Sequence, residues 1–255
     1  MDAPIANSAP VPVTLSGLEL TGRASTHVRE LPAFRCQLHP RAATALQAMR
    51  AAAAAAGIDL VPVSGFRDFG RQLAIWNEKF SGARPLLDRA GRPLAADSLN
   101  EAERVAAILL WSALPGASRH HWGSDCDLID RAALPAGTAV ELLGKHYAAG
   151  GRYAPLSAWL TRHAHDYGFF LPYDLDRGGV QPEPWHWSFA PVAAPAQAAL
   201  QPELLRAALA EARLLGWESV RPELPQIFAR YVAAVASAPS AALAAVALSR
   251  AATPA

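Results

Sequence analysis

A ten-residue stretch, SRHHWGSDCD at residues 118–127, constrains this chain more than any other segment. It follows the turn-forming pair Pro115-Gly116 and runs into the apolar pair Leu128-Ile129, so we expect a loop that leads into a strand. Zinc in proteins is bound by imidazole nitrogen and carboxylate oxygen, and a catalytic zinc site keeps one position for water. A histidine on the loop and an aspartate on the strand are therefore candidate ligands of one ion.

The residue types alone leave the choice of ligands open. The candidate histidine is His120 or His121, and the candidate aspartate is Asp125 or Asp127. A further ligand is available in the segment EPWHW at residues 183–187, where a glutamate precedes a histidine by three residues. Two separated segments thus carry one complementary set of metal-binding groups.

These two segments together resemble a known family. The motif SxHxxGxxxD at residues 118–127, followed by ExWH at residues 183–186, is similar to the VanY-type D-alanyl-D-alanine carboxypeptidases of the M15 metallopeptidases, which share the zinc fold of the hedgehog amino-terminal domain. The resemblance extends over about residues 64–189. One departure is Asp125, because the family usually has a small residue there. This carboxylate either points away from the metal or competes with Asp127.

The resemblance implies an α+β fold, in which helices pack around a small antiparallel sheet as in the hedgehog and D-Ala-D-Ala peptidase structures. A helical C-terminal appendage is expected in addition. We therefore predict three parts: an N-terminal extension at residues 1–38, a zinc peptidase domain at residues 39–192 and a helical C-terminal region at residues 193–255.

The resemblance also implies roles for single residues. His120, Asp127 and His186 would hold Zn²⁺, with His121 as the alternative first ligand. Glu183 would act as the general base that takes a proton from water.

Three more residues are placed around the substrate by the same resemblance. Arg67, in the segment SGFR at residues 64–67, would lie beside the peptide carbonyl or carboxylate, and Gln72 would support it. Ser118 would contact the terminal carboxylate. Trp185 and Trp187 would exclude water from the site, although two core tryptophans would give the same sequence.

The implied activity is zinc-dependent hydrolysis of the terminal peptide bond of peptidoglycan stem peptides that end in D-alanine. The alternatives are an LD-carboxypeptidase, a peptidoglycan endopeptidase and a zinc-binding module of the same fold without activity. Glu183 favours an enzyme, because a module that only binds has no need of a base. A cysteine peptidase is disfavoured, since the aspartates on either side of Cys126 would raise the pKa of its thiol.

Composition limits the partners. The chain has 255 residues, of which 52% are hydrophobic and 18% charged, as is typical of a globular protein. A formal net charge of +1 indicates neither nucleic acid nor an anionic membrane as partner. The peptide substrate is what the resemblance implies. The two cysteines, Cys36 and Cys126, are too few for a disulfide framework. The oligomeric state is not predicted.

Neither end of the chain has the pattern expected of a membrane span or an export signal. Residues 1–16 contain no lysine or arginine and no apolar run, so they do not have the pattern of a secretory signal. We therefore expect a cytoplasmic location, with the periplasm as the alternative by another route. Residues 231–249 carry no charge, but their alanines and Pro239 favour a helical tail over a membrane span.

Local patterns predict the remaining elements. We expect strands at residues 58–63, 139–143, 169–173 and 185–189, a hairpin around residues 89–91, a turn at residues 174–181, and helices at residues 39–57, 68–80, 98–113, 155–167, 202–215 and 222–235. The segment SLNE at residues 98–101 has the pattern of a capping box. Pro191 and Pro195 indicate a boundary, and His163 is expected to face the core with His165 on the surface.

Overall fold

The computed structural model describes residues 13–248, so most of the segment considered as a leader lies outside the described residues. The strands are β1 Arg29–Leu31, β2 Cys36–Leu38, β3 Leu60–Ser64, β4 Leu86–Leu87, β5 Pro93–Leu94, β6 Asp125–Asp130, β7 Phe169–Phe170 and β8 His186–Phe189. The α-helices are α1 Gly17–Leu20, α2 Pro40–Ala55, α3 Phe69–Phe80, α4 Glu101–Leu109, α5 Gly144–Tyr147, α6 Ala154–His163, α7 Ala190–Ala199, α8 Pro202–Ala210, α9 Trp217–Ile227 and α10 Ser240–Leu248.

A four-stranded antiparallel sheet in the order β3-β6-β8-β7 forms the centre of the fold. In its register, Ser64 pairs with Asp127, which in turn pairs with His186 on the far side. Residues paired across neighbouring strands project from the same face of a sheet. The pairing therefore puts one residue from each of three strands into a single row.

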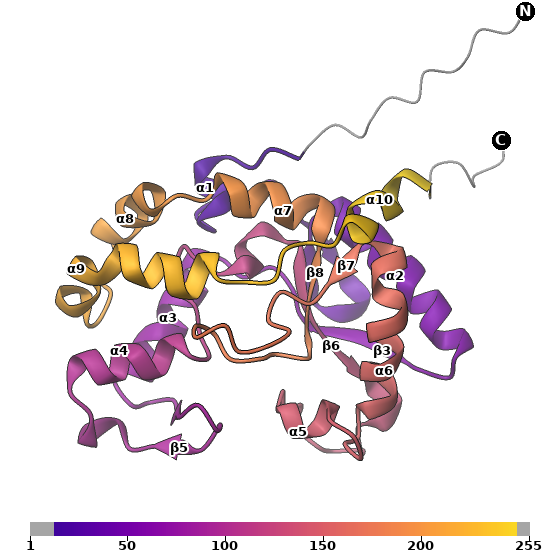
Figure 1. Cartoon of the computed structure of the whole chain (residues 1–255), viewed down its shortest axis with the longest axis horizontal. Helices are drawn as coiled ribbons and strands as arrows, with labels where there is room; N and C mark the ends of the chain where they lie inside the picture. The colour runs from indigo at the N-terminus through magenta and orange to yellow at the C-terminus, as the bar shows by residue number, and fades with distance from the viewer. Residues whose placement is uncertain (1–12, 249–255) are drawn as a thin grey trace, which may run out of the picture.

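The helices that flank the sheet begin where the sequence provides caps. α2 starts with Pro40 in its first turn, and the Nδ1 atom of His39 accepts a hydrogen bond from the backbone of Arg41. α3 starts after Asp68, whose carboxylate accepts from the backbone of Arg71. In Figure 1, α2 and α6 lie to the right of the sheet, and α3, α4, α8 and α9 lie to the left.

Two hydrophobic clusters hold these layers together. One cluster joins α2 and α6 to the sheet through side chains such as Leu46, Leu128 and Leu160. The other cluster joins α3, α4 and the C-terminal helices, and Trp76 and Ile108 are fully buried in it. The expected fold class, helices packed around a small antiparallel sheet, is thus confirmed.

The C-terminal helices pack on the rest of the chain. The Trp76 indole donates to the backbone of Leu215 at 3.0 Å, and Asn77 binds the same segment through both amide atoms. The cluster that contains Trp76 also includes Leu20 from the N-terminal part and Leu205 from the C-terminal part. The division into three parts stays a prediction, but all three contribute to one core.

Among the local predictions, a helix cap was wrong in position, a strand was wrong and a hairpin is present. The helix expected at residues 98–113 is α4, and its capping box is formed by Asn100 with Glu103, not by Ser98 with Glu101. No strand forms at residues 139–143. The expected hairpin is present as β4 and β5.

Two further predictions need correction. The boundary expected at Pro191 and Pro195 falls inside a helix, because both residues lie in α7, with Pro191 in its first turn. His163 does not face the core: its side chain is 44% exposed, and it lies near Asp166 together with His165. Among residues 13–248, every helix is too short or too polar to cross a membrane.

Candidate metal centre

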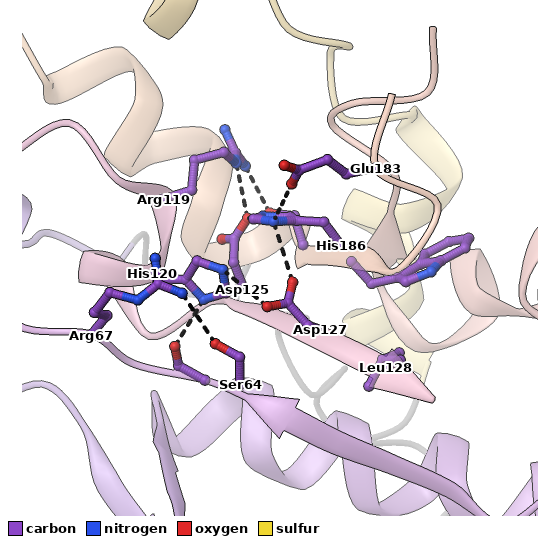
Figure 2. Close-up of polar contacts among 12 residues, drawn as sticks. Ser64, Arg67, Arg119, His120, Asp125, Asp127, Leu128, Glu183 and His186 are labelled. Atoms are coloured by element: carbon purple, nitrogen blue, oxygen red, sulfur yellow. Dashed lines mark hydrogen bonds and ion pairs between the residues drawn. The ribbon is translucent and has the colours of Figure 1, made fainter. Parts of the chain in front are cut away.

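Three of the predicted residues converge at the row across the sheet. His120, Asp127 and His186 each offer one ligand atom, and these atoms all lie within 4.8 Å of one another. His120 Nε2 lies 3.7 Å from Asp127 Oδ2, and His186 Nδ1 lies 3.5 Å from Asp127 Oδ1. Two atoms that bind one zinc at about 2.0–2.1 Å in tetrahedral geometry lie roughly 3.4 Å apart. The spacing therefore suits a single ion, and Figure 2 shows the three side chains pointing toward one another.

His120 is held with one nitrogen free. Its Nδ1 atom donates to the backbone carbonyl of Gly65 at 2.8 Å, because a carbonyl can only accept. The lone pair of the neutral ring is then on Nε2, which faces Asp127. Burial and the positive charge of Arg67 lower the pKa of His120 well below its usual value, so the ring stays neutral, as a metal ligand requires.

His121 has a different role, although it is the next residue. Its Nδ1 atom donates to the carbonyl of Arg67 at 2.6 Å, and its Nε2 atom accepts from the backbone of Gly116 at 3.0 Å. Both ring nitrogens are therefore used within the protein, and no nitrogen is left for a metal. The backbone of Arg67 also donates to the carbonyl of His120 at 3.2 Å, so the two histidines hold the segment that carries Arg67.

Gly123 ends the turn that presents these histidines. Its φ of 64° lies in the left-handed region that favours glycine. A Cβ atom there would lie 2.4 Å from Val28 Cγ1 and 2.8 Å from the backbone nitrogen of His39. The glycine of the motif is thus needed because the N-terminal part of the chain packs closely over the turn.

The centre attracts positive charge. Burial raises the pKa of Asp127 to about 6, and the nearby carboxylate of Glu183 also raises it. Burial opposes the charged form of His186, but hydrogen bonds with Asp125 and Glu183 raise the pKa of His186 to about 10. Three carboxylates surround this one imidazole, which takes up a proton when no other cation is nearby.

Glu183 lies at the edge of the three converging residues. Its Oε2 atom is 3.2 Å from His186 Nδ1, and 12% of its side chain is exposed. The loop that carries it is fixed by the backbone of Glu183, which donates to Tyr173 at 3.0 Å. This carboxylate is close enough to the candidate ligands to reach a water molecule among them.

Arg67 and Gln72 are in contact, and their roles toward a substrate stay a prediction. Arg67 donates from one terminal nitrogen to Gln72 Oε1 at 2.8 Å and from the other to Ser64 Oγ at 3.4 Å. Gln72 is fully buried and donates to the backbone of Ala113 at 2.8 Å, so it is a fixed support. Ser118 is buried where the turn at Arg119–Trp122 begins.

The sequence did not single out Arg119, Lys79 or Tyr173. Arg119 is 4% exposed and donates from Nε to Asp125 Oδ1 at 2.9 Å. Lys79 donates to Ser112 Oγ at 2.9 Å; burial lowers the pKa of Lys79 to about 8, although the charge of Glu183 raises it in part. Only the position of Arg119 between two motif residues gave a signal.

Tyr173 packs its ring edge-on against His186, with the ring centres 5.0 Å apart. Trp185 and Trp187 lie in the hydrophobic cluster with α2 and α6, where Trp187 pairs with Cys126 across the sheet. The sequence had left open whether the tryptophans cover the site or belong to the core, and they belong to the core. Burial also raises the pKa of the Cys126 thiol well above its usual value, which fits an inert cysteine.

The family follows from a comparison with known proteins. A family model described as D-alanyl-D-alanine carboxypeptidase, VanY, matches residues 35–192, more than half of the chain. The chain belongs to the VanY family. The resemblance drawn from the motifs at residues 118–127 and 183–186 is thereby confirmed.

Relatives of this VanY-family chain cover it to different extents. An uncharacterized protein of Haemophilus influenzae is 43% identical over 98 residues, which is 37% of this chain and 67% of that protein. A D-alanyl-D-alanine carboxypeptidase of Enterococcus faecalis is 26% identical over 152 residues, which is 58% of this chain and 47% of that protein. The solved structure of VanYB in complex with D-alanine-D-alanine is 21% identical, covers 75% of this chain and 92% of its own, and has a TM-score of 0.49.

The residues of the centre fit a zinc ion. Asp127 Oδ1 is buried and has no hydrogen-bond partner among the described residues. A buried acceptor without a partner is costly unless a ligand satisfies it. Two imidazoles and one carboxylate with a free position are the donor set of a catalytic zinc site.

Proposed function

We propose that this VanY-family chain is a zinc-dependent carboxypeptidase that hydrolyses the terminal peptide bond of peptides ending in D-alanine, as in peptidoglycan stem peptides. The observation that carries the proposal is the convergence of His120, Asp127 and His186 beside the carboxylate of Glu183. Membership of the VanY family supports the substrate class.

His120, Asp127 and His186 would hold the zinc, through His120 Nε2, an oxygen of Asp127 and His186 Nδ1. Zinc in such a site acts as a Lewis acid toward the peptide carbonyl and lowers the pKa of a water molecule toward neutrality. The burial of all three side chains keeps bulk water away from the reacting bond and strengthens the local electrostatics.

Glu183 would act as the general base. It takes a proton from the attacking water and delivers it to the amine of the departing D-alanine, so that the protons balance over the reaction. Glu183 also favours an enzyme over a silent zinc-binding module, because binding alone needs only the three converging residues. Its partial exposure leaves room for a substrate to approach.

Arg67 and Ser118 would bind the substrate. The guanidinium of Arg67 is held in place by Gln72 and Ser64, and its fork of donors suits a carboxylate or a developing oxyanion. Ser118 would contribute a hydroxyl to the terminal carboxylate. Lys79 lies on the same helix as Gln72 and adds a cation near Glu183.

One assay separates this function from its alternatives. Purified protein is given zinc or a chelator and then a peptide ending in D-Ala-D-Ala, its C-terminal amide, and a peptide ending in L-residue-D-Ala. We expect zinc-dependent release of D-alanine from the D-Ala-D-Ala acid and at least tenfold slower cleavage of the amide. Preference for the L-D bond would indicate an LD-carboxypeptidase, and equal rates on acid and amide would indicate an endopeptidase. Zinc binding without any cleavage would indicate the silent module.

A further inference from the structure

Asp125 is as buried as the candidate ligands but has a complete set of partners. Its Oδ1 atom accepts from Arg119 Nε at 2.9 Å and lies 2.9 Å from His186 Nε2. The hydroxyl of Ser124 donates to its Oδ2 atom. Both oxygens are therefore engaged, and Asp125 does not compete with Asp127 for the metal.

The contact with Asp125 fixes which nitrogen of His186 is free. An ionised carboxylate only accepts hydrogen bonds, so His186 Nε2 must carry a proton to bind it. When the ring is neutral, its lone pair is then on Nδ1. Nδ1 is the atom that faces Asp127 at 3.5 Å and Glu183 at 3.2 Å. Asp125 thus turns the Nδ1 edge of the ring toward Asp127 and Glu183, as Figure 2 shows.

Arg119 connects this contact to the C-terminal helices. One terminal nitrogen donates to Ser188 Oγ at 2.7 Å on β8, and the other donates to Gln197 Oε1 at 2.8 Å on α7. Gln197 in turn donates to the backbone of Val232 at 3.2 Å. The guanidinium also stacks over Trp122, 4.8 Å from the ring centre. A continuous line of contacts therefore runs from the candidate metal centre to the C-terminal region.

We propose that Asp125 is a positioning residue that holds His186 for metal binding through Nδ1, and that Arg119 and Gln197 make the C-terminal region a support of the metal centre. The inference rests on the zinc site of the proposed function, but it does not depend on the substrate. Groups that orient a metal-binding histidine commonly change metal affinity by about 10–100-fold when they are removed. A salt bridge that only stabilises the fold would leave the metal affinity unchanged.

The variants are chosen to separate positioning from folding. Asp125→Asn keeps an oxygen acceptor and removes the charge. The double variant Asp125→Ala with Arg119→Leu removes the whole ion pair, which is less harmful than leaving one buried charge alone. Asp130→Asn is the matched control, because Asp130 is buried on the same strand and accepts from the backbone of Asp59 and of Ala132.

The measurements are the zinc dissociation constant by chelator competition, the visible spectrum of the Co²⁺-loaded protein, and the melting temperature. We expect zinc binding to weaken about tenfold in Asp125→Asn and up to about 100-fold in the double variant, with an altered Co²⁺ spectrum. Asp130→Asn should lower the melting temperature and leave the zinc constant unchanged. Gln197→Leu should weaken zinc binding only a few-fold, because Arg119 loses one acceptor and keeps Asp125 and Ser188.

An unchanged zinc constant and Co²⁺ spectrum in the Asp125 variants would overturn the proposal. If those variants fail to fold, long-range proton–nitrogen NMR of the unaltered zinc-loaded protein gives the answer. A proton on His186 Nε2 supports the proposal, and a proton on Nδ1 overturns it. Zinc binding without hydrolysis in the unaltered protein would contradict the proposed function alone, since these measurements read the metal and not the substrate.

Discussion

Asp125 and Asp127 lie two residues apart on one strand and are both buried, yet their pKa values are shifted in opposite directions. Burial raises the pKa of Asp127 to about 6. Burial acts on Asp125 in the same direction, but the charge of Arg119 and the hydrogen bond from His186 lower its pKa below the ordinary value. Asp127 has a carboxylate oxygen without a hydrogen-bond partner, whereas both carboxylate oxygens of Asp125 have partners. Partners therefore distinguish a candidate ligand from a support where burial does not.

The largest expected effect comes from removing one of the three candidate zinc ligands. Asp127→Ala should abolish stoichiometric zinc binding and lower the turnover number more than about a thousandfold, because the pKa of water returns from near 7 toward 15.7 without the metal. Metal analysis and the D-alanine release assay measure the two effects.

Two variants sharpen this result. His120→Gln should behave like Asp127→Ala, whereas His121→Gln should keep zinc and instead lower the melting temperature, because both ring nitrogens of His121 bind backbone groups. Zinc lost from His121→Gln but kept in His120→Gln would reverse the assignment of the ligand.

A smaller effect on turnover is expected at Glu183, which lies beside the three candidate ligands. Glu183→Gln should retain zinc and the fold but lower turnover by about 100-fold or more, the usual contribution of a general base. Glu141→Gln is the control, since Glu141 is an exposed carboxylate near His146, remote in sequence from the motifs. Unchanged turnover in Glu183→Gln would show that another group takes the proton.

Arg67→Lys should have its effect on substrate recognition. Hydrogen bonds to charged groups contribute about 1.5–3 kcal/mol, so losing the fork of donors should raise KM for the acid peptide by roughly 10–100-fold. The amide peptide should be less affected. Arg71→Lys is the matched control, because Arg71 is an exposed arginine in the first turn of α3, the helix that follows Arg67. An equal change for acid and amide would mean that Arg67 does not bind the carboxylate.

The smallest effect is on the pH dependence of stability and comes from His39, whose backbone donates to Gly123 of the motif turn. Burial, with a further contribution from the charges of His27 and Arg41, lowers the pKa of His39 to about 4. The unfolded chain, with a histidine pKa of about 6.5, binds more protons between these values, so stability should fall as the pH drops from 6.5 toward 4.

His39→Asn keeps a side-chain cap for α2 and removes the titrating ring. The loss of melting temperature between pH 7 and pH 5 should therefore shrink, by roughly 2 °C because His39 is partly exposed. Thermal unfolding monitored by circular dichroism at both pH values measures the difference. The same loss in parent and variant would assign the pH dependence to other groups.

The two motifs indicated which segments carry the candidate ligands, and the choice of Asp127 over Asp125 came from the resemblance. Asp127 and His186 belong to neighbouring strands, and the motifs placed both at strand positions. The choice of His120 over His121 came from the resemblance, since both are polar residues of one short turn. Only the contacts of the ring nitrogens give a physical reason for that choice.

Other features depend on contacts that no local pattern contains. The segments SLNE at residues 98–101 and NEAE at residues 100–103 overlap, and both fit a capping box, so packing decides between them. α7 was missed because proline usually ends a helix, whereas burial of Ala193 and Ala196 outweighs the lost hydrogen bond. Gln197, the link to the metal centre, was missed with that helix.

The line of support around the centre also has a consequence for how the protein folds. The Trp122 indole donates to the backbone of Leu20, 102 residues away, and Arg119 donates to Gln197, 78 residues away. Contacts between distant residues form slowly, because long loops must close first. At a synthesis rate of about 5–20 residues per second, the segment around Leu20 is made roughly 5–20 seconds before Trp122. The complete centre therefore closes late, when the chain has been made at least as far as Val232.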